Sequence, residues 1–247
     1  METKSQPRVY GDRARIGLVV PSTNTVAEIE FWRMAPDGVT VHTSRMPFLP
    51  KRYDDPLAEM EQHVPRVLEE AVSAEPDVIA YGCTASSAKG DPEIYRTKLC
   101  AHAGTETLTA AGALVAALGA LGATRVVLVT PYPQSVNDHE CEFFAGQGIE
   151  VLADESVIVD EAQRELRHMS RVGTGPLVEA AVRLASRHQP DAVVLSCCDM
   201  PTLDAIPAIE RATGLPVISS AQALFWQALR STGVTDSVPT AGQLLSR

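Results

Sequence analysis

Two of the five cysteines, Cys83 and Cys197, follow apolar segments that match each other in the sequence. Pro76-DVIAYGC and Pro190-DAVVLSC share a proline, an aspartate, an apolar run, a small residue and the cysteine, at an offset of 114 residues. A thiolate is a good nucleophile and a usable base, whereas a thiol is an acid near neutral pH. Two such groups on opposite sides of one molecule would act as an acid and base pair, or as a nucleophile and a proton donor.

The other cysteines and the histidines indicate neither disulfide bonds nor a metal site. The five cysteines are odd in number and form no Cys-x-x-Cys pair, and the opening METKSQPRVYGDRAR is too polar for a secretory signal. We expect a cytoplasmic protein with reduced cysteines and no disulfide scaffold or zinc ribbon. Cys100 and Cys141 have no counterpart in the other half and are expected to be small apolar residues. The six histidines lack ligand spacing, so no metal site is expected.

Hydrogen-bonding groups follow the same apolar runs. Gly82-CTASS and Ser196-CCD offer consecutive backbone N–H groups, among them those of Thr84, Ala85 and Cys198. Such groups can bind a carboxylate or phosphate without a basic side chain. Uncharged polar residues also follow the first apolar run of each half: Ser22, Thr23, Asn24, Thr25, Tyr132, Gln134, Ser135 and Asn137. The segment PSTNT is equally typical of a turn and a helix N-cap, and the two interpretations are compatible.

The elements that must position these residues alternate between short apolar runs and amphipathic stretches. This alternation is typical of βαβ units and a parallel sheet. The expected strands are Ile16–Val20, Val39–Ser44, Val78–Tyr81, Val126–Thr130, Ile149–Leu152, Val193–Ser196 and Val217–Ser219. The expected helices are Pro56–Ser73, Thr107–Gly119, Asn137–Gly146, Gly175–His188, Thr202–Ala212 and Ala221–Ser231.

An internal repeat organises these elements into two copies of one α/β module. Arg15-IGLVVPSTNTVAE matches Arg125-VVLVTPYPQSVND, and Ala111-GALV matches Ala221-QALF, each at an offset of 110 residues. We expect two pseudo-symmetric lobes: residues 1–118, completed by the C-terminal helix 221–247, and residues 119–220. Ligands of open parallel sheets bind beyond the carboxyl ends of the strands. Cys83 and Cys197 should therefore flank one bound molecule.

The composition excludes several classes of protein. With 247 residues, 45% of them apolar and 21% charged, the chain has the composition of an ordinary globular protein. The formal charge of −10 argues against a nucleic-acid or anionic-membrane partner, which would require a basic face. No apolar run approaches the ~18 residues of a membrane span.

From about Ile16 to Gly233 the chain resembles the aspartate/glutamate racemase superfamily, and within it the maleate cis-trans isomerase and arylmalonate decarboxylase branch. The stretches that carry the resemblance are IGLVVPSTNT, DVIAYGCTASS, RVVLVTPYPQSVND and VVLSCCDMPTLDAIPAIERATGLPVISS. The resemblance implies two pseudo-symmetric α/β lobes, no cofactor or metal, and one cysteine on each side of a small carboxylate. It also implies a homodimer or a higher homo-oligomer.

Within this branch some positions are more similar to the isomerases, whereas others are as similar to the decarboxylases. Arylmalonate decarboxylases have a glycine where this chain has Cys83. PSTNT is similar to the Pro-Ser-Ser-Asn-Thr motif of the isomerases, which makes Asn24 a carboxylate-contacting residue, and Tyr132 matches a substrate-contacting tyrosine. The segment TLDAIPAIERATGLPVISS is as similar to the decarboxylases. Asp160 or Glu161 replaces an asparagine of the isomerases, and an acid there would repel a second substrate carboxylate by ~1–4 kcal/mol.

The leading hypothesis is a cofactor-independent cis-trans isomerase of a small unsaturated dicarboxylate, of the maleate to fumarate type. Cys83, as a thiolate favoured by its place at a strand end, would add to the double bond, and Cys197 would exchange protons. Backbone N–H groups, Asn24 and Tyr132 would stabilise the developing charge. The alternatives are a racemase or decarboxylase that acts alpha to a carboxylate through the same two cysteines, and a catalytically silent binding protein.

Overall fold

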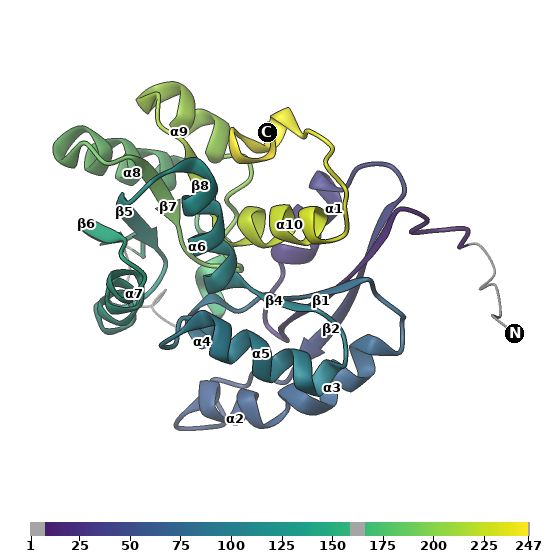
Figure 1. Ribbon diagram of the computed structural model, residues 1–247. Helices are drawn as coiled ribbons and strands as arrows, with labels where there is room; N and C mark the ends of the chain where they lie inside the picture. The colour runs from purple at the N-terminus through teal and green to yellow at the C-terminus, as the bar shows by residue number, and fades with distance from the viewer. Residues whose placement is uncertain (1–7, 159–165, 247) are drawn as a thin grey trace, which may run out of the picture.

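The computed structural model describes residues 8–158 and 166–246, which fold into two four-stranded parallel sheets flanked by helices (Figure 1). The first-lobe sheet has the order β2-β1-β3-β4 and the second-lobe sheet the order β6-β5-β7-β8. Their strands are β1 (Ala14–Pro21), β2 (Val39–Met46), β3 (Val78–Tyr81), β4 (Thr107–Thr109), β5 (Arg125–Thr130), β6 (Glu150–Ser156), β7 (Ala192–Leu195) and β8 (Val217–Ser219). The shared order confirms the predicted fold class of two similar α/β lobes.

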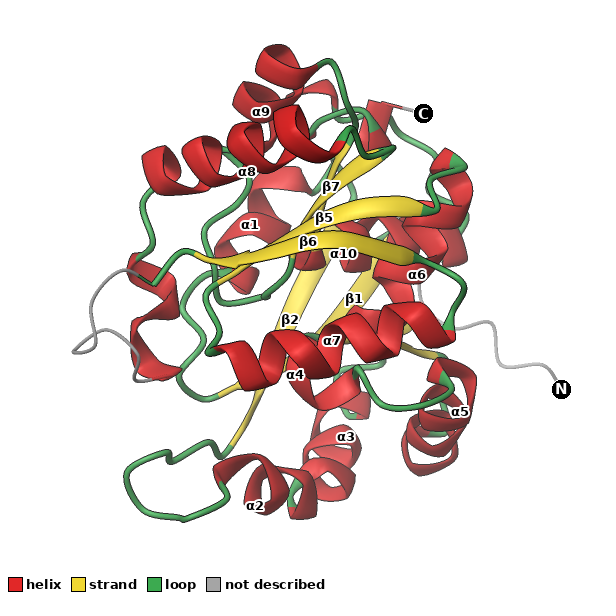
Figure 2. Cartoon of the chain, turned by 90° about the vertical axis from the view of Figure 1, so that its left-hand side faces the viewer, coloured by secondary structure: helices red, strands yellow, loops and turns green. Residues whose placement is uncertain are grey.

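Helices cover both faces of each sheet. In Figure 2, α7 and α8 lie on opposite sides of the second-lobe sheet, and their buried residues pack against alternate residues of β5. The helices are α1 (Ala27–Met34), α2 (Pro56–Gln62), α3 (Val64–Val72), α4 (Thr84–Ser87), α5 (Pro92–Ala103), α6 (Ala110–Leu121), α7 (Gln134–Gly146), α8 (Thr174–His188), α9 (Ile206–Thr213) and α10 (Ser220–Ser231). The central strands β3 and β7, which are buried along their whole length, are apolar throughout, as the sequence predicted.

One hydrophobic core runs through both lobes. Helices α6 and α10 pack against each other, and each also contacts both β4 and β8. Their side chains Leu114 and Phe225 belong to the same buried cluster as Leu18 of the first-lobe sheet and Leu128 and Val194 of the second. The two sheets are therefore joined by apolar packing, which holds their carboxyl ends in a fixed relation. The lobe boundary at residue 118 stays a prediction.

The aspartate of each matched sequence block has the same structural role. The backbone N–H of Asp77 donates to the Arg15 carbonyl at 2.8 Å, and the Arg15 N–H donates back to the Asp77 carboxylate at 2.8 Å. Asp191 and Arg125 exchange equivalent hydrogen bonds of 2.7 and 2.8 Å. The repeated Pro-Asp pair thus fixes the register of two neighbouring strands in each lobe.

Several predicted elements differ from those observed. Residues Thr107–Thr109 form strand β4 and only then does the helix begin, because the Thr109 side chain caps α6 at its first turn. The expected helix Pro56–Ser73 is two helices, with Pro65 in the first turn of the second. Residues 202–205 form a turn ahead of α9. Helices α1, α4 and α5 were not predicted.

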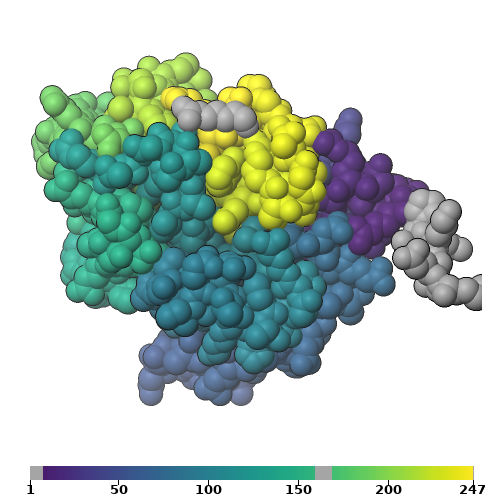
Figure 3. Space-filling view, viewed as in Figure 1, coloured from purple at the N-terminus to yellow at the C-terminus, as the bar shows by residue number. Residues whose placement is uncertain are grey.

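The C-terminal residues pack back onto the first lobe. In Figure 3 they lie beside the N-terminal strand region, in agreement with the ion pair between Arg13 and Asp236. Within the chain, Gln222 of α10 donates to the Ala241 carbonyl at 2.5 Å. None of the helices among the described residues is both long and apolar enough to cross a membrane.

Candidate active site

Each of the two matched cysteines lies two residues beyond the end of a central strand. Cys83 follows β3, which ends at Tyr81, and Cys197 follows β7, which ends at Leu195. The intervening residues make equivalent hydrogen bonds: Gly82 N–H donates to the Val19 carbonyl at 2.7 Å and Ser196 N–H to the Val129 carbonyl at 2.9 Å. The ladder thus extends past each strand and places each cysteine at the carboxyl edge of its sheet.

The residue before Cys83 has to be small. A Cβ atom on Gly82 would lie 3.0 Å from Val20 Cγ1 and 3.3 Å from Leu18 Cδ1, within the buried core of β1. These distances are tighter than ordinary van der Waals contact, so a larger residue would displace the chain at Cys83. Gly82 therefore allows Cys83 to take its place at the edge of the sheet.

All of the predicted site residues come together at a single cavity of about 250 Å³. The predicted lining residues are Asn24, Cys83, Thr84, Ala85, Tyr132, Cys197 and Cys198. The sequence did not identify the rest of the lining, which is mostly apolar: Pro21, Thr23, Phe48, Leu57, Gly82, Pro133, Val136, Met169 and Asp199. The cavity draws on both lobes, since Cys83 follows β3 and Cys197 follows β7.

The Asn24 side chain holds two loops together. Its Nδ2 donates to the Cys198 carbonyl at 3.1 Å, and its Oδ1 accepts from the N–H groups of Val26 and Ala27 at 3.0 Å each. Asn24 is almost fully buried. It therefore starts α1 and also joins the loop after β1 to the loop after β7.

The sulfur atoms lie among hydrogen-bonding groups of both lobes. The Asp199 N–H donates to Cys197 Sγ at 3.3 Å, and Thr84 Oγ1 lies 3.7 Å from Cys198 Sγ. Thr84 and Ala85 are the first residues of α4, so their N–H groups have no acceptor within that helix. The site thus presents backbone N–H groups beside Cys83 and Cys197, as expected for the stabilisation of an anion.

Other polar residues of the same loops are occupied elsewhere. Ser22 exchanges hydrogen bonds with the backbone of Phe48, and Asn137 bonds to Thr130 and Asp154. Among the uncharged polar residues that the sequence analysis named in these loops, Thr23, Asn24 and Tyr132 line the cavity. Of the others, Ser22, Gln134 and Asn137 hydrogen-bond to neighbouring residues.

Burial controls the acidity of both cysteines. It raises the pKa of Cys83, although hydrogen bonds with Ser86 act in the opposite direction. Burial also raises the pKa of Cys197 well above its ordinary value, and the nearby charge of Asp199 adds to the effect, against hydrogen bonds from Tyr132 and the Asp199 N–H. The expectation that a strand-end position favours the thiolate is therefore wrong for the free site, because desolvation outweighs the N–H groups.

Asp199 is a functional-site candidate that the sequence analysis missed. It is 8% exposed, and burial raises its pKa to about 6, although the Thr25 N–H and the charge of Arg45 act in the opposite direction. Its Oδ1 accepts from the Thr25 N–H at 2.9 Å. An aspartate directly after two cysteines resembles ordinary turn chemistry in sequence, so only the fold reveals that it lines the cavity.

Two further predictions concern the acid at Asp160 or Glu161 and the metal content of the site. Asp160 and Glu161 fall in residues 159–165, outside the described residues, so their relation to the cavity stays a prediction. Over residues 8–158 and 166–246, no group of three or more histidine, cysteine, aspartate or glutamate side chains is arranged to hold a metal ion.

The two parallel-sheet lobes and the pair of strand-end cysteines at one cavity define a two-lobed α/β protein with a two-cysteine site. The arylmalonate decarboxylase family model matches residues 82–245, and the chain belongs to this family. It is 35% identical to the maleate isomerase of Nocardia farcinica, over 94% of this chain and 95% of that protein.

Solved structures of maleate isomerases have the same fold. The structure of the Nocardia farcinica enzyme, as a cysteine-to-serine variant with a covalently bound succinylcysteine intermediate, matches with a TM-score of 0.85 and 30% identity, over 94% of this chain and 98% of that one. A cysteine-to-alanine variant of the maleate isomerase of Pseudomonas putida S16, with maleate, matches with a TM-score of 0.84 and 29% identity, over 94% and 97% of the two chains.

Proposed function

We propose that this chain is a cis-trans isomerase of a small unsaturated dicarboxylate, converting maleate to fumarate through Cys83 and Cys197. The observation that carries the proposal is the pair of matched cysteines, one after β3 and one after β7, at one small cavity. The similarity to maleate isomerases, one of which holds a covalent succinylcysteine, supports the same chemistry here.

In the proposed reaction Cys83 first loses its proton to solvent, and the resulting thiolate adds to one carbon of the double bond. The electron pair of the double bond moves to the neighbouring carbon and its carboxylate, and Cys197 donates a proton to that carbon. The central carbon–carbon bond is then single and rotates. Cys197 takes the proton back, the double bond reforms and the Cys83 sulfur leaves, so no co-reactant is consumed.

The different environments of the two cysteines assign these roles. Burial raises the pKa of both, but that of Cys197 rises well above its ordinary value. Cys83, whose hydrogen bonds with Ser86 act against the effect of burial, takes the role of nucleophile that the resemblance to the isomerases implies. Cys197 remains a thiol, which is the form that a proton donor needs.

The charge that develops on the substrate carboxylate is stabilised by the donors around the cavity. These are the N–H groups of Thr84, Ala85 and Cys198 and the hydroxyl of Tyr132, with the second N–H of the Asn24 amide. They are held by α4 and by the Asn24 bridge before the substrate binds. Fixed donors of this kind lower the barrier because they need little reorganisation during the reaction.

A decarboxylase that acts on a substituted malonate is the second candidate. The family model and the apolar lining, with Phe48, Leu57 and Met169, favour it. Cys83 argues for the isomerase, because the decarboxylases have a glycine at the matching position.

Proton NMR of the purified protein with maleate tests the proposal. We expect the fumarate signal to grow, and Cys83→Ser and Cys197→Ser each to abolish the growth, whereas Cys100→Ser and Cys141→Ser, which change cysteines away from the cavity, leave it intact. Release of carbon dioxide from phenylmalonate without any turnover of maleate would establish the decarboxylase instead. Full isomerase activity in Cys83→Ser would overturn the mechanism.

Three broader expectations belong to the same proposal. The reaction uses thiol chemistry and requires no cofactor or metal. Because all five cysteines are free in the structure, the protein works in a reducing compartment such as the cytoplasm. It assembles as a homodimer, which would cover exposed apolar residues of α1 such as Ile29 and Trp32. Light scattering after size-exclusion chromatography measures the assembly.

A further inference from the structure

The charge distribution of the cavity is unusual for a site that binds an anion. Among the described residues that line it, Asp199 is the only carboxylate, and no lysine, arginine or histidine is present. A doubly charged substrate would therefore enter a largely apolar cavity that already holds an acid. Like charges at short range in such surroundings repel strongly, so one of the carboxyl groups must gain a proton.

Asp199 is only partly satisfied by the protein. Its Oδ1 accepts from the Thr25 N–H at 2.9 Å, whereas no described residue donates a hydrogen bond to Oδ2. Asp199 is also held close to the reacting groups, because its own N–H donates to Cys197 Sγ at 3.3 Å. One carboxylate oxygen is thus free to accept a hydrogen bond from a molecule in the cavity.

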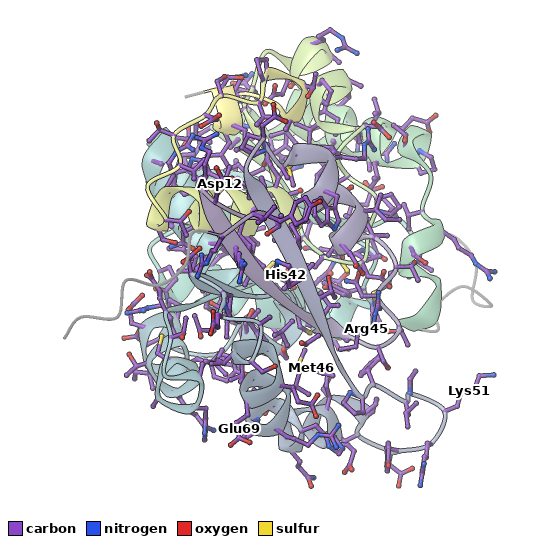
Figure 4. The ribbon with its side chains drawn as sticks, turned by 90° about the vertical axis from the view of Figure 1, so that its right-hand side faces the viewer. Asp12, His42, Arg45, Met46, Lys51 and Glu69 are labelled. Atoms are coloured by element: carbon purple, nitrogen blue, oxygen red, sulfur yellow. The ribbon has the colours of Figure 1, made fainter. Side chains whose placement is uncertain are left out.

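The neighbouring positive charge is committed to other partners. Arg45, near the carboxyl end of β2 in Figure 4, donates to the Asn24 carbonyl at 2.6 Å and to the Glu28 carboxylate at 3.0 Å. Arg45 lowers the pKa of Asp199 without an ion pair between the two. Lys51, in the loop after β2, points away from the body of the molecule in Figure 4.

We propose that Asp199 is a specificity-determining residue. Its carboxylate accepts a hydrogen bond from the second polar group of the substrate, which must therefore be a group that can donate one. This inference rests on the proposed function and narrows its substrate class. The site then binds cis-unsaturated acids as monoanions: a dicarboxylate that has gained one proton, or a monoamide of the same acid. A dicarboxylate dianion binds together with one proton from solvent, which the Asp199 carboxyl and the substrate carboxyl share.

The other titratable groups around Asp199 do not account for such a proton. Cys197 and Cys198 lie on the same loop, Cys83 and Tyr132 line the same cavity, and burial raises the pKa of each of them. They are therefore neutral near pH 7 and have no proton to gain. Asp199, with a pKa of about 6, is the group of this set that changes charge in the working range.

Saturated analogues test the inference without any catalysis. Isothermal titration calorimetry of succinate and succinamate, at about pH 6 and about pH 8 and in two buffers of different ionisation enthalpy, counts the protons that are bound with each ligand. We expect succinate binding to take up about one proton at the higher pH and to weaken about tenfold per pH unit there, whereas succinamate binding takes up none.

The Asp199→Asn variant identifies the group responsible. It should bind succinate without proton uptake, with an affinity that no longer depends on pH. The matched control is Glu28→Gln, which changes the Arg45 partner outside the cavity and should keep the uptake of the wild type. Uptake that persists in Asp199→Asn overturns the proposal, and so does wild-type binding of succinate that is independent of pH.

The remaining outcomes also decide the proposal. The proton count of the wild type requires no variant, so it stands if Asp199→Asn does not fold. If neither analogue binds measurably, the ratio of kcat/KM for maleamate over maleate should rise with pH, and a constant ratio overturns the proposal. Proton uptake with succinate in a protein that never converts maleate would retain the role of Asp199 and reject the isomerase.

Discussion

The Asn24 side chain donates a hydrogen bond from Nδ2 to the Cys198 carbonyl at 3.1 Å, across the boundary between the two lobes. Cys198 adjoins Cys197, and Asn24 lies in the loop that follows β1, the strand beside the one that positions Cys83. The contact therefore couples the positions of the Cys83 and Cys197 sulfur atoms. The distance between them depends on a buried amide as well as on the packing of α6 and α10.

Asn24→Asp isolates this contact. The aspartate keeps an oxygen for the N–H groups of Val26 and Ala27 but cannot donate to the Cys198 carbonyl. Because the site is buried, we expect the free energy of unfolding to fall by about 1–3 kcal/mol, measured by urea denaturation. Thr25→Ser, which changes an exposed neighbour whose backbone alone is bonded, should stay within about 0.5 kcal/mol of the wild type. Equal stability of Asn24→Asp and the wild type would show that the bridge contributes nothing.

Glu30 holds the loop after Cys197 from the side of α1. Its buried carboxylate accepts from the N–H groups of Thr202 and Leu203 at 2.6 and 2.8 Å and from the Thr202 hydroxyl at 3.1 Å. Glu30→Ala leaves the N–H groups of Thr202 and Leu203 without an acceptor, so we expect a loss of about 3 kcal/mol in chemical denaturation, together with a lower kcat. Glu28→Ala on the same helix removes only an exposed ion pair and should cost less than about 1 kcal/mol. Similar losses in the two variants would refute this role of Glu30.

Glu140 makes the stability of the protein depend on pH. It is fully buried on α7, and burial raises its pKa from 4.5 to about 8, although the neighbouring Ser196 hydroxyl acts in the opposite direction. The folded chain therefore keeps a proton that the unfolded chain releases above about pH 4.5. The contribution of Glu140 to the free energy of unfolding should fall as pH rises from about 4.5 to about 8 and stay constant above that.

Glu140→Gln removes this dependence. At about pH 8 the variant should be more stable than the wild type, by an amount of up to about 5 kcal/mol, and the difference should shrink toward about pH 5. Denaturation at a series of pH values measures it. Glu142→Gln, an exposed change on the same helix, is the matched control and should follow the wild-type curve. Parallel curves for Glu140→Gln and the wild type would contradict a buried, protonated Glu140.

The repeat in the sequence was sufficient to predict where the two sulfur atoms lie. Cys83 and Cys197 end matched strands, and parallel sheets bring strand ends to one edge, so the cavity followed from the topology. Asp199 could not be found in this way, because its role depends on the tertiary packing that buries it beside Thr25. The acidity of the thiols could not be predicted from the sequence either, because the pKa of each thiol depends on how deeply it is buried.

The missed elements have separate causes. Strand β4 has three residues and runs directly into the apolar helix α6, so the periodicity does not separate the two. Helix α1 has no capping side chain at the residue before it, because Asn24 supplies the acceptor from further upstream. Helix α5 was predictable: Asp91 caps it, Pro92 is its first residue, and Gly104 follows its end in the left-handed conformation.

Mass spectrometry of the Cys197→Ser variant after incubation with maleate tests the two-cysteine account most directly. In this variant solvent water supplies the proton that completes the adduct, but no thiolate is left to remove that proton again, so the adduct should accumulate. The account predicts a mass increase of one substrate molecule, mapped to the peptide that contains Cys83. An adduct on Cys198, Cys100 or Cys141 in place of Cys83, or wild-type turnover of maleate by Cys83→Ser, would contradict it.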